Sequence, residues 1–220
     1  MPFDSINSYL LLDDDGSVTL IDTGLRGAPP RIVAALAQLG RAPQDVQRII
    51  LTHAHADHAG GARELARLTG VAPEIHGDDE PYARSGHQPP SDPAVPLGRL
   101  FARLGAARRG FPPFAPGPAL HDGQVVDVAG GLRVVHTPGH SPGHVSLLHA
   151  ATGVLITGDA IFNLRRLRWP LRQFCSDFAL TQRTAHVLGE LEYSVAAFTH
   201  GPHISVRARE QVRSFLAAAR

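Results

Sequence analysis

The chain has 220 residues, which suits one domain whose core needs no disulfide bonds for stability. Its formal net charge of +1 excludes the strong positive field that would recruit nucleic acid or an acidic membrane. The single cysteine, Cys175, excludes an internal disulfide, and neither a signal segment nor an apolar run of roughly 18 residues is present. We therefore expect a cytoplasmic protein without nucleic-acid or membrane partners.

The first third of the chain alternates predicted strands and helices. A turn at Asp13–Gly16 joins the first two strands, and Pro29 and Pro30 open the first helix, which Gly40 stops. We expect strands over 8–12, 17–21 and 48–52, and helices over 31–39 and 61–69. This order predicts an α/β sandwich.

Residues 85–118 have a different character, because 8 prolines interrupt them. Only Leu97–Arg109 has the spacing of a helix. Loops of this length are usually either functional or mobile, so the segment is either a Pro-rich insertion near a site or a plain linker between two halves.

The second half of the chain again has predicted strands followed by helices. Gly130 and Gly131 form a hairpin signature between two apolar runs. We expect strands over 124–128, 132–135, 145–148 and 154–157, and helices over 177–192 and 206–219. Two similar halves of strands followed by helices predict a single domain, residues 1–220, with a site between pseudo-symmetric halves.

Four side chains of metal-ligand type occupy six positions directly after the predicted strand 48–52: His53, His55, Asp57 and His58. Residues two apart in an extended segment point the same way, so the first two histidines can hold one metal ion together. Asp57 and His58 fall where the chain turns into a helix, which directs them at a second metal. Such ligands suit zinc first, and then iron or manganese.

Three further candidate ligands lie at the ends of predicted strands or in the turns after them. His140 lies in the sequence TPGHSPGH, Asp159 follows LITG, and His200 follows AAFT. Each is a polar ligand type placed where an apolar strand leaves the core, so these residues can complete the coordination that the first motif begins.

The motif His-x-His-x-Asp-His, with Asp22, His140, Asp159 and His200 in this order, resembles the metallo-β-lactamase-fold superfamily, and especially its glyoxalase II-like hydrolases. The resemblance covers nearly the whole chain. It implies a four-layer αββα sandwich and two divalent metal ions, with Asp22 supporting the cluster from behind. It assigns the ligands of the two ions, with Asp159 shared by both: His53, His55 and His140 to the first, and Asp57, His58 and His200 to the second.

The implied activity is hydrolysis of an ester, thioester or lactone. A bound cation can lower the pKa of water from about 15.7 to about 7, so a hydroxide that bridges the two metals would be the nucleophile. Asp57 would be the catalytic residue that accepts a hydrogen bond from this hydroxide and orients it.

Other functions remain open from the sequence. A mononuclear iron sulfur dioxygenase acting on a thiol persulfide is the main alternative, and a phosphodiesterase or nuclease is less favoured because the net charge is close to neutral. The acidic bridge at Asp159 argues against an antibiotic-hydrolysing β-lactamase. The last helix lacks the substrate-binding tail of glyoxalase II.

Candidate substrate residues lie near the ligands. Arg168 and Trp169 belong to a basic run that is either a solvated face or a clamp for an anionic small molecule, and His203 could donate to a leaving group. His144 is interpreted as structural, and Cys175 as an inert thiol outside the metal frame. A short first strand would leave a sheet edge that a second copy of the chain could cover.

Overall fold

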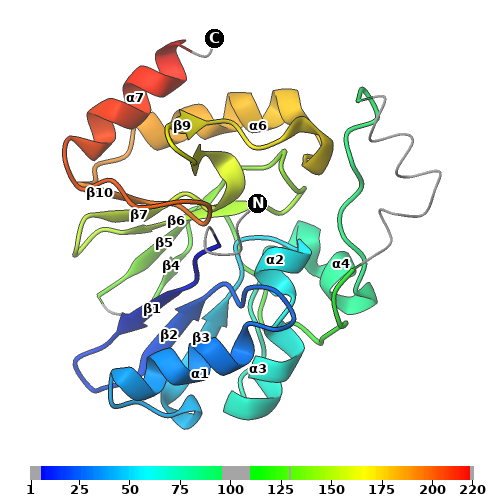
Figure 1. The fold of residues 1–220 in the computed structure, drawn as a ribbon, viewed down its shortest axis with the longest axis vertical. Coiled ribbons are helices and arrows are strands. Elements are labelled where there is room, and N and C mark those ends of the chain that lie inside the picture. The colour runs from blue at the N-terminus through cyan, green and yellow to red at the C-terminus, as the bar shows by residue number, and fades with distance from the viewer. Residues whose placement is uncertain (1–5, 96–109, 129, 219–220) are drawn as a thin grey trace.

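The strands of this computed structural model, which describes residues 6–95, 110–128 and 130–218, form two main sheets (Figure 1). The first has the order β1-β2-β3: β1 (Tyr9–Leu12), β2 (Val18–Ile21) and β3 (Val46–Ile50). The second has the order β10-β7-β6-β5-β4: β4 (Val125–Val126), β5 (Leu132–His136), β6 (Val145–His149), β7 (Val154–Ile156) and β10 (Val195–Ala197). A separate hairpin pairs β8 (Phe162–Asn163) with β9 (Leu167–Arg168).

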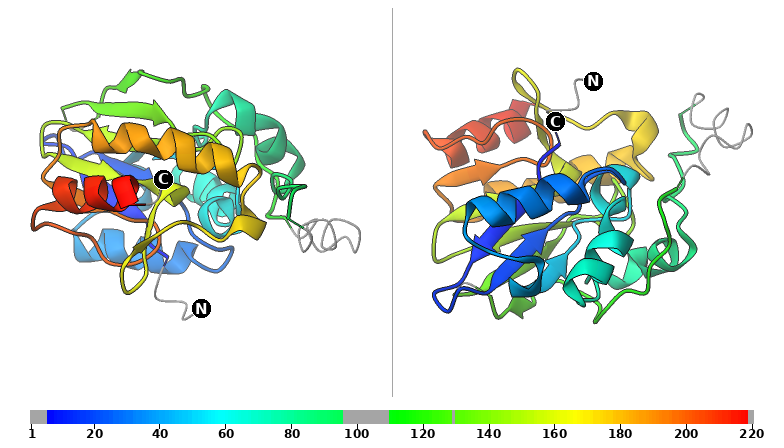
Figure 2. Two further views of the ribbon diagram at one scale, coloured as in Figure 1. Left: turned by 90° about the horizontal axis from the view of Figure 1, so that it is seen from above. Right: turned by 60° about the horizontal axis from the view of Figure 1, so that its bottom comes forward.

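Helices cover the outer face of each sheet (Figure 1). The first half carries α1 (Pro29–Gln38), α2 (Ala56–Ala59), α3 (Ala62–Thr69) and α4 (Glu80–Ser85), and the second carries α6 (Phe178–Ala185) and α7 (Ala208–Ala218). The view from above in Figure 2 shows α6 and α7 on the same outer face. Among the described helices, none is long and apolar enough to cross a bilayer.

Three buried apolar clusters correspond to the three interfaces of a four-layer αββα sandwich. Successive side chains of a strand point to opposite faces, so neighbouring residues belong to different clusters. Leu20 packs toward α1 and α3, whereas Ile21 packs between the sheets. In β7, Leu155 packs toward α6 and α7, whereas Ile156 packs between the sheets. The predicted fold class is confirmed.

The ends of the strands bring the two halves together where the ligand segments begin. The backbone N–H of Val145, at the start of β6, donates to the carbonyl of Thr52 at 2.9 Å. On the other side, Ile6 forms an isolated antiparallel bridge with His200. Segments at the ends of strands from both sheets therefore contact one another, and the candidate ligands lie in these segments.

The predicted elements differ from the structure mainly at their ends. β3 spans Val46–Ile50 rather than 48–52, because its pairing with β2 begins at Val18 and Val46 and ends at Ile21 and Ile50. The predicted helix 177–192 is α6 followed by a separate 3-10 helix, His186–Gly189. The helix predicted over Leu97–Arg109 lies outside the described residues.

Candidate metal centre

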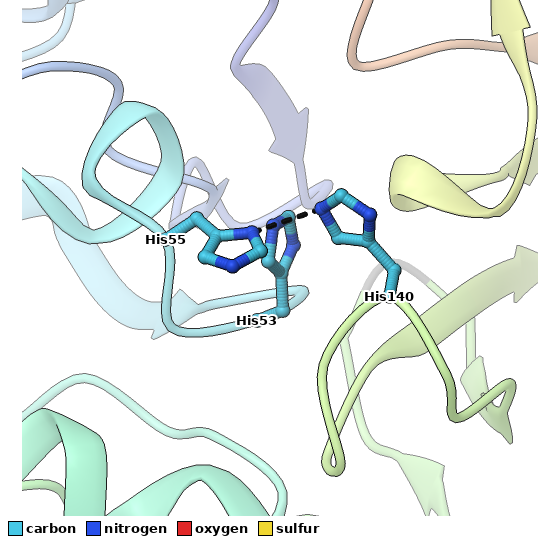
Figure 3. Close-up of side chains that lie close together, drawn as sticks. All are labelled: His53, His55 and His140. Carbon is cyan, nitrogen blue, oxygen red and sulfur yellow. Dashed lines mark hydrogen bonds between the residues drawn. The ribbon is translucent and has the colours of Figure 1, made fainter. Parts of the chain in front are cut away.

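The first group of candidate ligands comes from two loops far apart in the sequence. His53 and His55 lie between β3 and α2, and His140 lies between β5 and β6 (Figure 3). One ring nitrogen of each histidine lies within 4.8 Å of the other two, and all three side chains are buried. Nδ1 of His55 is 2.9 Å from Nε2 of His140. The pairing of these loops, predicted from the resemblance, is therefore present in the fold.

A second group forms beside it from Asp57, His58 and His200, whose ligand atoms also lie within 4.8 Å of one another. Oδ2 of Asp57 lies 3.4 Å from Nε2 of His200 and 3.8 Å from Nε2 of His58. Asp57 and His58 belong to the single turn of α2, and His200 follows β10. The second group therefore also combines ligands from both halves of the chain.

Asp159 lies between the two groups. Its Oδ2 is 3.1 Å from Nε2 of His140, in the first group, and 3.4 Å from Nε2 of His200, in the second. Its Oδ1 is 3.3 Å from Nε2 of His58 and accepts a hydrogen bond from the hydroxyl of Thr199 at 2.7 Å. One carboxylate thus faces both groups at once.

Asp22 determines which ring nitrogens of His53 and His58 face the cluster. It is buried, and its Oδ2 accepts hydrogen bonds from Nδ1 of His58 at 2.9 Å and from the hydroxyl of Thr52 at 2.8 Å. Because that hydroxyl donates to Asp22, its oxygen accepts from Nδ1 of His53 at 3.0 Å. Asp22 therefore directs both Nε2 atoms inward, one directly and one through Thr52.

The residues present fit a bound cation. Nε2 of His53 and Nε2 of His58 are buried and have no hydrogen-bond partner, which is costly unless another group satisfies them. Their outer nitrogens donate to oxygens of Thr52 and Asp22, the arrangement typical of metal-bound histidines. Imidazole nitrogens and carboxylate oxygens are the donor set that zinc, iron and manganese accept.

The electrostatics divide the histidines into two kinds. Burial holds the pKa of His53 well below its ordinary value and lowers the pKa of His55 to about 3, so both rings are neutral. Burial also lowers the pKa of His140 and His200, but the Asp159 carboxylate outweighs it and raises them to about 10 and about 9. Cation binding must release these protons, so metal affinity rises with pH.

His144 has the structural role that its sequence position indicated. Its Nδ1 donates to the carbonyl of Thr137 at 3.0 Å, and its Nε2 accepts the backbone N–H of Asp159 at 2.7 Å. Both ring nitrogens are therefore occupied, and burial lowers the pKa of His144 to about 3. This neutral ring therefore holds the backbone of Asp159 in place through its hydrogen bond to the N–H of Asp159.

Two residues beside the cluster were not recognised from the sequence. Cys175 is outside the candidate ligand groups, as expected, but its buried Sγ lies 3.5 Å from Nδ1 of His140, a contact that the sequence did not indicate. Asp79 is buried between the loop of His53 and His55 and the loop of His140. Nothing in the sequence distinguishes Asp79 from the exposed Asp78 before it, because both follow Gly77 in what reads as a turn.

In its described part, the Pro-rich segment contacts the start of α2, next to His55, and the loop that carries Cys175. Oε1 of Gln88 accepts the N–H of Ala56 at 3.0 Å, and the N–H of Asp92 donates to the carbonyl of Cys175 at 2.7 Å. A cavity of about 560 Å³ opens beside α2, and four stretches of the chain line it: Leu25, Arg26, Ala56, Gly60, Gly86, His87, Gly110, Phe111 and Pro112.

The structure separates the three candidate substrate residues. Arg168 is exposed on β9, directly across from Phe162, whose ring lies 4.4 Å from that of His200. Trp169 packs instead against Phe215 of α7, with ring centroids 4.8 Å apart, so its part in a clamp for an anionic substrate is not supported. His203 is exposed in the loop after His200.

A further group of ligand-type residues lies away from this centre. His76, Asp78 and His136 have ligand atoms within 4.8 Å of one another. The two rings stack with an interplanar angle of 14°, so their lone pairs lie in nearly parallel planes and do not converge on one point. The geometry is therefore that of a stacked pair rather than of a cation site.

Comparisons with known proteins agree with this geometry. A family model described as "Metallo-beta-lactamase superfamily" matches residues 1–218 of the chain. Protein YobT of Bacillus subtilis is 30% identical, over 94% of this chain and 89% of its own. Hydroxyacylglutathione hydrolase GloC of Haemophilus influenzae is 29% identical, over 71% of this chain and 66% of its own. The crystal structure of the metallo-beta-lactamase family protein TTHA1429 from Thermus thermophilus has a TM-score of 0.75 and 29% identity, covering 100% of this chain and 76% of that one.

The match over nearly the whole chain, the common fold and the cluster of histidines and aspartates lead to one conclusion. The chain belongs to the metallo-beta-lactamase superfamily and is a metal-dependent hydrolase.

Proposed function

We propose that the chain is a dinuclear hydrolase that cleaves an ester, thioester or lactone of a small molecule. The observation that carries this proposal is the position of Asp159, whose carboxylate faces His140 of one group and His200 of the other. A carboxylate with two such neighbours is suited to bridge two cations. The assigned ligands are His53, His55 and His140 for one cation, Asp57, His58 and His200 for the other, and Asp159 for both.

Zinc is the proposed metal because the ligands are mainly imidazoles, and iron or manganese would fit the same donor set. When bound, such cations make hydroxide available near neutral pH and polarise the oxygen of the scissile group. The chain itself supplies the buried, preoriented ligands and excludes bulk water from most of them.

We assign to Asp57 the role of orienting the attacking water molecule. Its side chain is 33% exposed, whereas those of Asp22 and Asp159 are 1% and 4% exposed. Asp57 is therefore the carboxylate of the cluster that can contact both the inner ligands and entering water. Burial raises the pKa of Asp57, but the charge of His58 and the hydrogen bond from His200 together lower it below its ordinary value, so Asp57 stays an acceptor at neutral pH.

The substrate is proposed to bind in the 560 Å³ cavity next to Ala56 and Gly60. The described part of the Pro-rich segment supplies His87 and Phe111 to its wall, which supports the interpretation of residues 85–118 as an insertion near the site. Since GloC carries the name hydroxyacylglutathione hydrolase, a glutathione thioester is the first substrate to assay, followed by lactones and neutral esters.

Metal content tests the proposal most directly. We expect about two metal ions per chain by elemental analysis, and loss of ester or thioester hydrolysis after chelation with recovery on adding zinc. One iron per chain without hydrolysis would contradict the proposal and would favour the sulfur dioxygenase. Assaying the same sample before and after chelation controls for differences in folding.

Arg168 tests whether the substrate is anionic. Residues paired across an antiparallel ladder share a face, so Arg168 lies on the same face of the β8–β9 hairpin as Phe162, which contacts His200. We expect Arg168→Ala to raise KM for an anionic thioester about tenfold, equivalent to about 1.4 kcal/mol, with little change for a neutral ester. Equal effects on both substrates would exclude the clamp. Arg133→Ala, at an exposed position on β5, is the control.

A further inference from the structure

A buried carboxylate outside the proposed ligand set joins the two ligand loops of the first group. Asp79 is 0% exposed and ends the 3-10 turn that leads into α4. Its Oδ2 accepts the backbone N–H of Ala54 at 2.8 Å and the hydroxyl of Ser141 at 2.7 Å. Its Oδ1 accepts the backbone N–H of Gly143 at 2.7 Å.

Two of the groups that donate to Asp79 lie next to proposed metal ligands in the sequence. Ala54 lies between His53 and His55 in the sequence, and Ser141 directly follows His140. The loops that carry these histidines come from different halves of the fold, and Asp79 hydrogen-bonds to both. Because hydrogen bonds to a charged acceptor are short and strong, the carboxylate limits how far the two loops can separate.

The packing around Asp79 leaves little freedom. A Cβ atom added to Gly143 would lie 2.7 Å from the backbone nitrogen and 2.9 Å from Cγ of Asp79, so only glycine permits this approach. All three groups around the carboxylate are donors. An amide in its place offers one acceptor oxygen, and its NH₂ group would face a backbone N–H or a donating hydroxyl.

We infer that Asp79 is a positioning residue for the metal centre: it holds the segment of His53 and His55 against the loop of His140, and so sets how tightly this group binds a cation. The inference rests on the proposed function, because it requires these three histidines to be ligands. It assigns Asp79 no contact with substrate or with the reacting atoms.

The test is Asp79→Asn, with Asp78→Asn as the matched control. The control makes the same chemical change at the neighbouring position, where the side chain is 60% exposed. Stepwise affinities for zinc and for cobalt(II) are measured by chelator competition, and cobalt absorption reports the ligand geometry. Loss of a group that orients metal ligands typically costs about 10- to 100-fold in affinity, so we expect Asp79→Asn to weaken one binding step by this factor and leave the other unchanged. Activity should recover in excess zinc.

Ser141→Ala keeps the inference testable if Asp79→Asn does not fold, because it removes one of the three donors and leaves the carboxylate in place. It should weaken the same binding step by a smaller factor. Unchanged affinities in Ser141→Ala, or an Asp79→Asn protein that binds both metals as tightly as Asp78→Asn, would overturn the inference. The wild-type protein separates the two proposals: if it binds no metal, the proposed function fails before Asp79 is tested.

Discussion

Replacing Asp159 by asparagine is expected to abolish hydrolysis and to remove at least one of two bound metals. The carboxylate lies 3.1 to 3.4 Å from the ring nitrogens of His140, His58 and His200, so it faces both proposed metal positions. The loss should exceed the roughly 10- to 100-fold that removal of an outer hydrogen-bond partner costs. Metal content and kcat/KM are measured on the same preparation.

Asp127→Asn is the matched control, because Asp127 is exposed and the same charge is lost. The metal-free protein offers a second measurement. The charge of Asp159 raises the pKa of His140 to about 10 and that of His200 to about 9, against the lowering effect of burial. NMR titration should therefore show both values falling in Asp159→Asn. Full metal content together with near wild-type activity would refute the assignment of Asp159 as the shared ligand.

Replacing Asp22 by asparagine is expected to have the second largest effect. Asp22 accepts from Nδ1 of His58 and, through Thr52, sets the tautomer of His53. An amide at this position can present its NH₂ group to one of these donors, which turns a ring nitrogen away from the tautomer that a ligand needs. We expect metal affinity to fall about 10- to 100-fold and stability to fall by about 1–3 kcal/mol, measured by chelator competition and by urea unfolding of the metal-free protein.

The choice of asparagine matters because Asp22 has a φ of 57°, in the left-handed region. Asparagine tolerates this region better than alanine does, so the substitution tests the carboxylate rather than the backbone. Asp14→Asn, an exposed change in the turn between β1 and β2, controls for general effects of lost charge. A variant that loses stability but binds both metals normally would show that Asp22 supports only the fold.

The sequence by itself determined the family, the fold class and the composition of the candidate metal centre. These features are local. The alternation of side chains along a strand places Leu20 and Ile21 in two different interfaces, and the six residues 53–58 carry four side chains that can ligate a metal. Such patterns are readable because a strand imposes its period of two on any sequence that forms it.

Only the tertiary structure decided which residues support these ligands. Asp79 lies 62 residues before Ser141, and Cys175 lies 35 residues after His140, so no local period relates them. From the sequence, Trp169 belongs to a basic run, but in the structure its ring packs against Phe215 of α7. Long-range contacts depend on how the layers stack. The carboxylate of Asp79 and that of Asp78 therefore differ in burial and role, although they are neighbours in the chain.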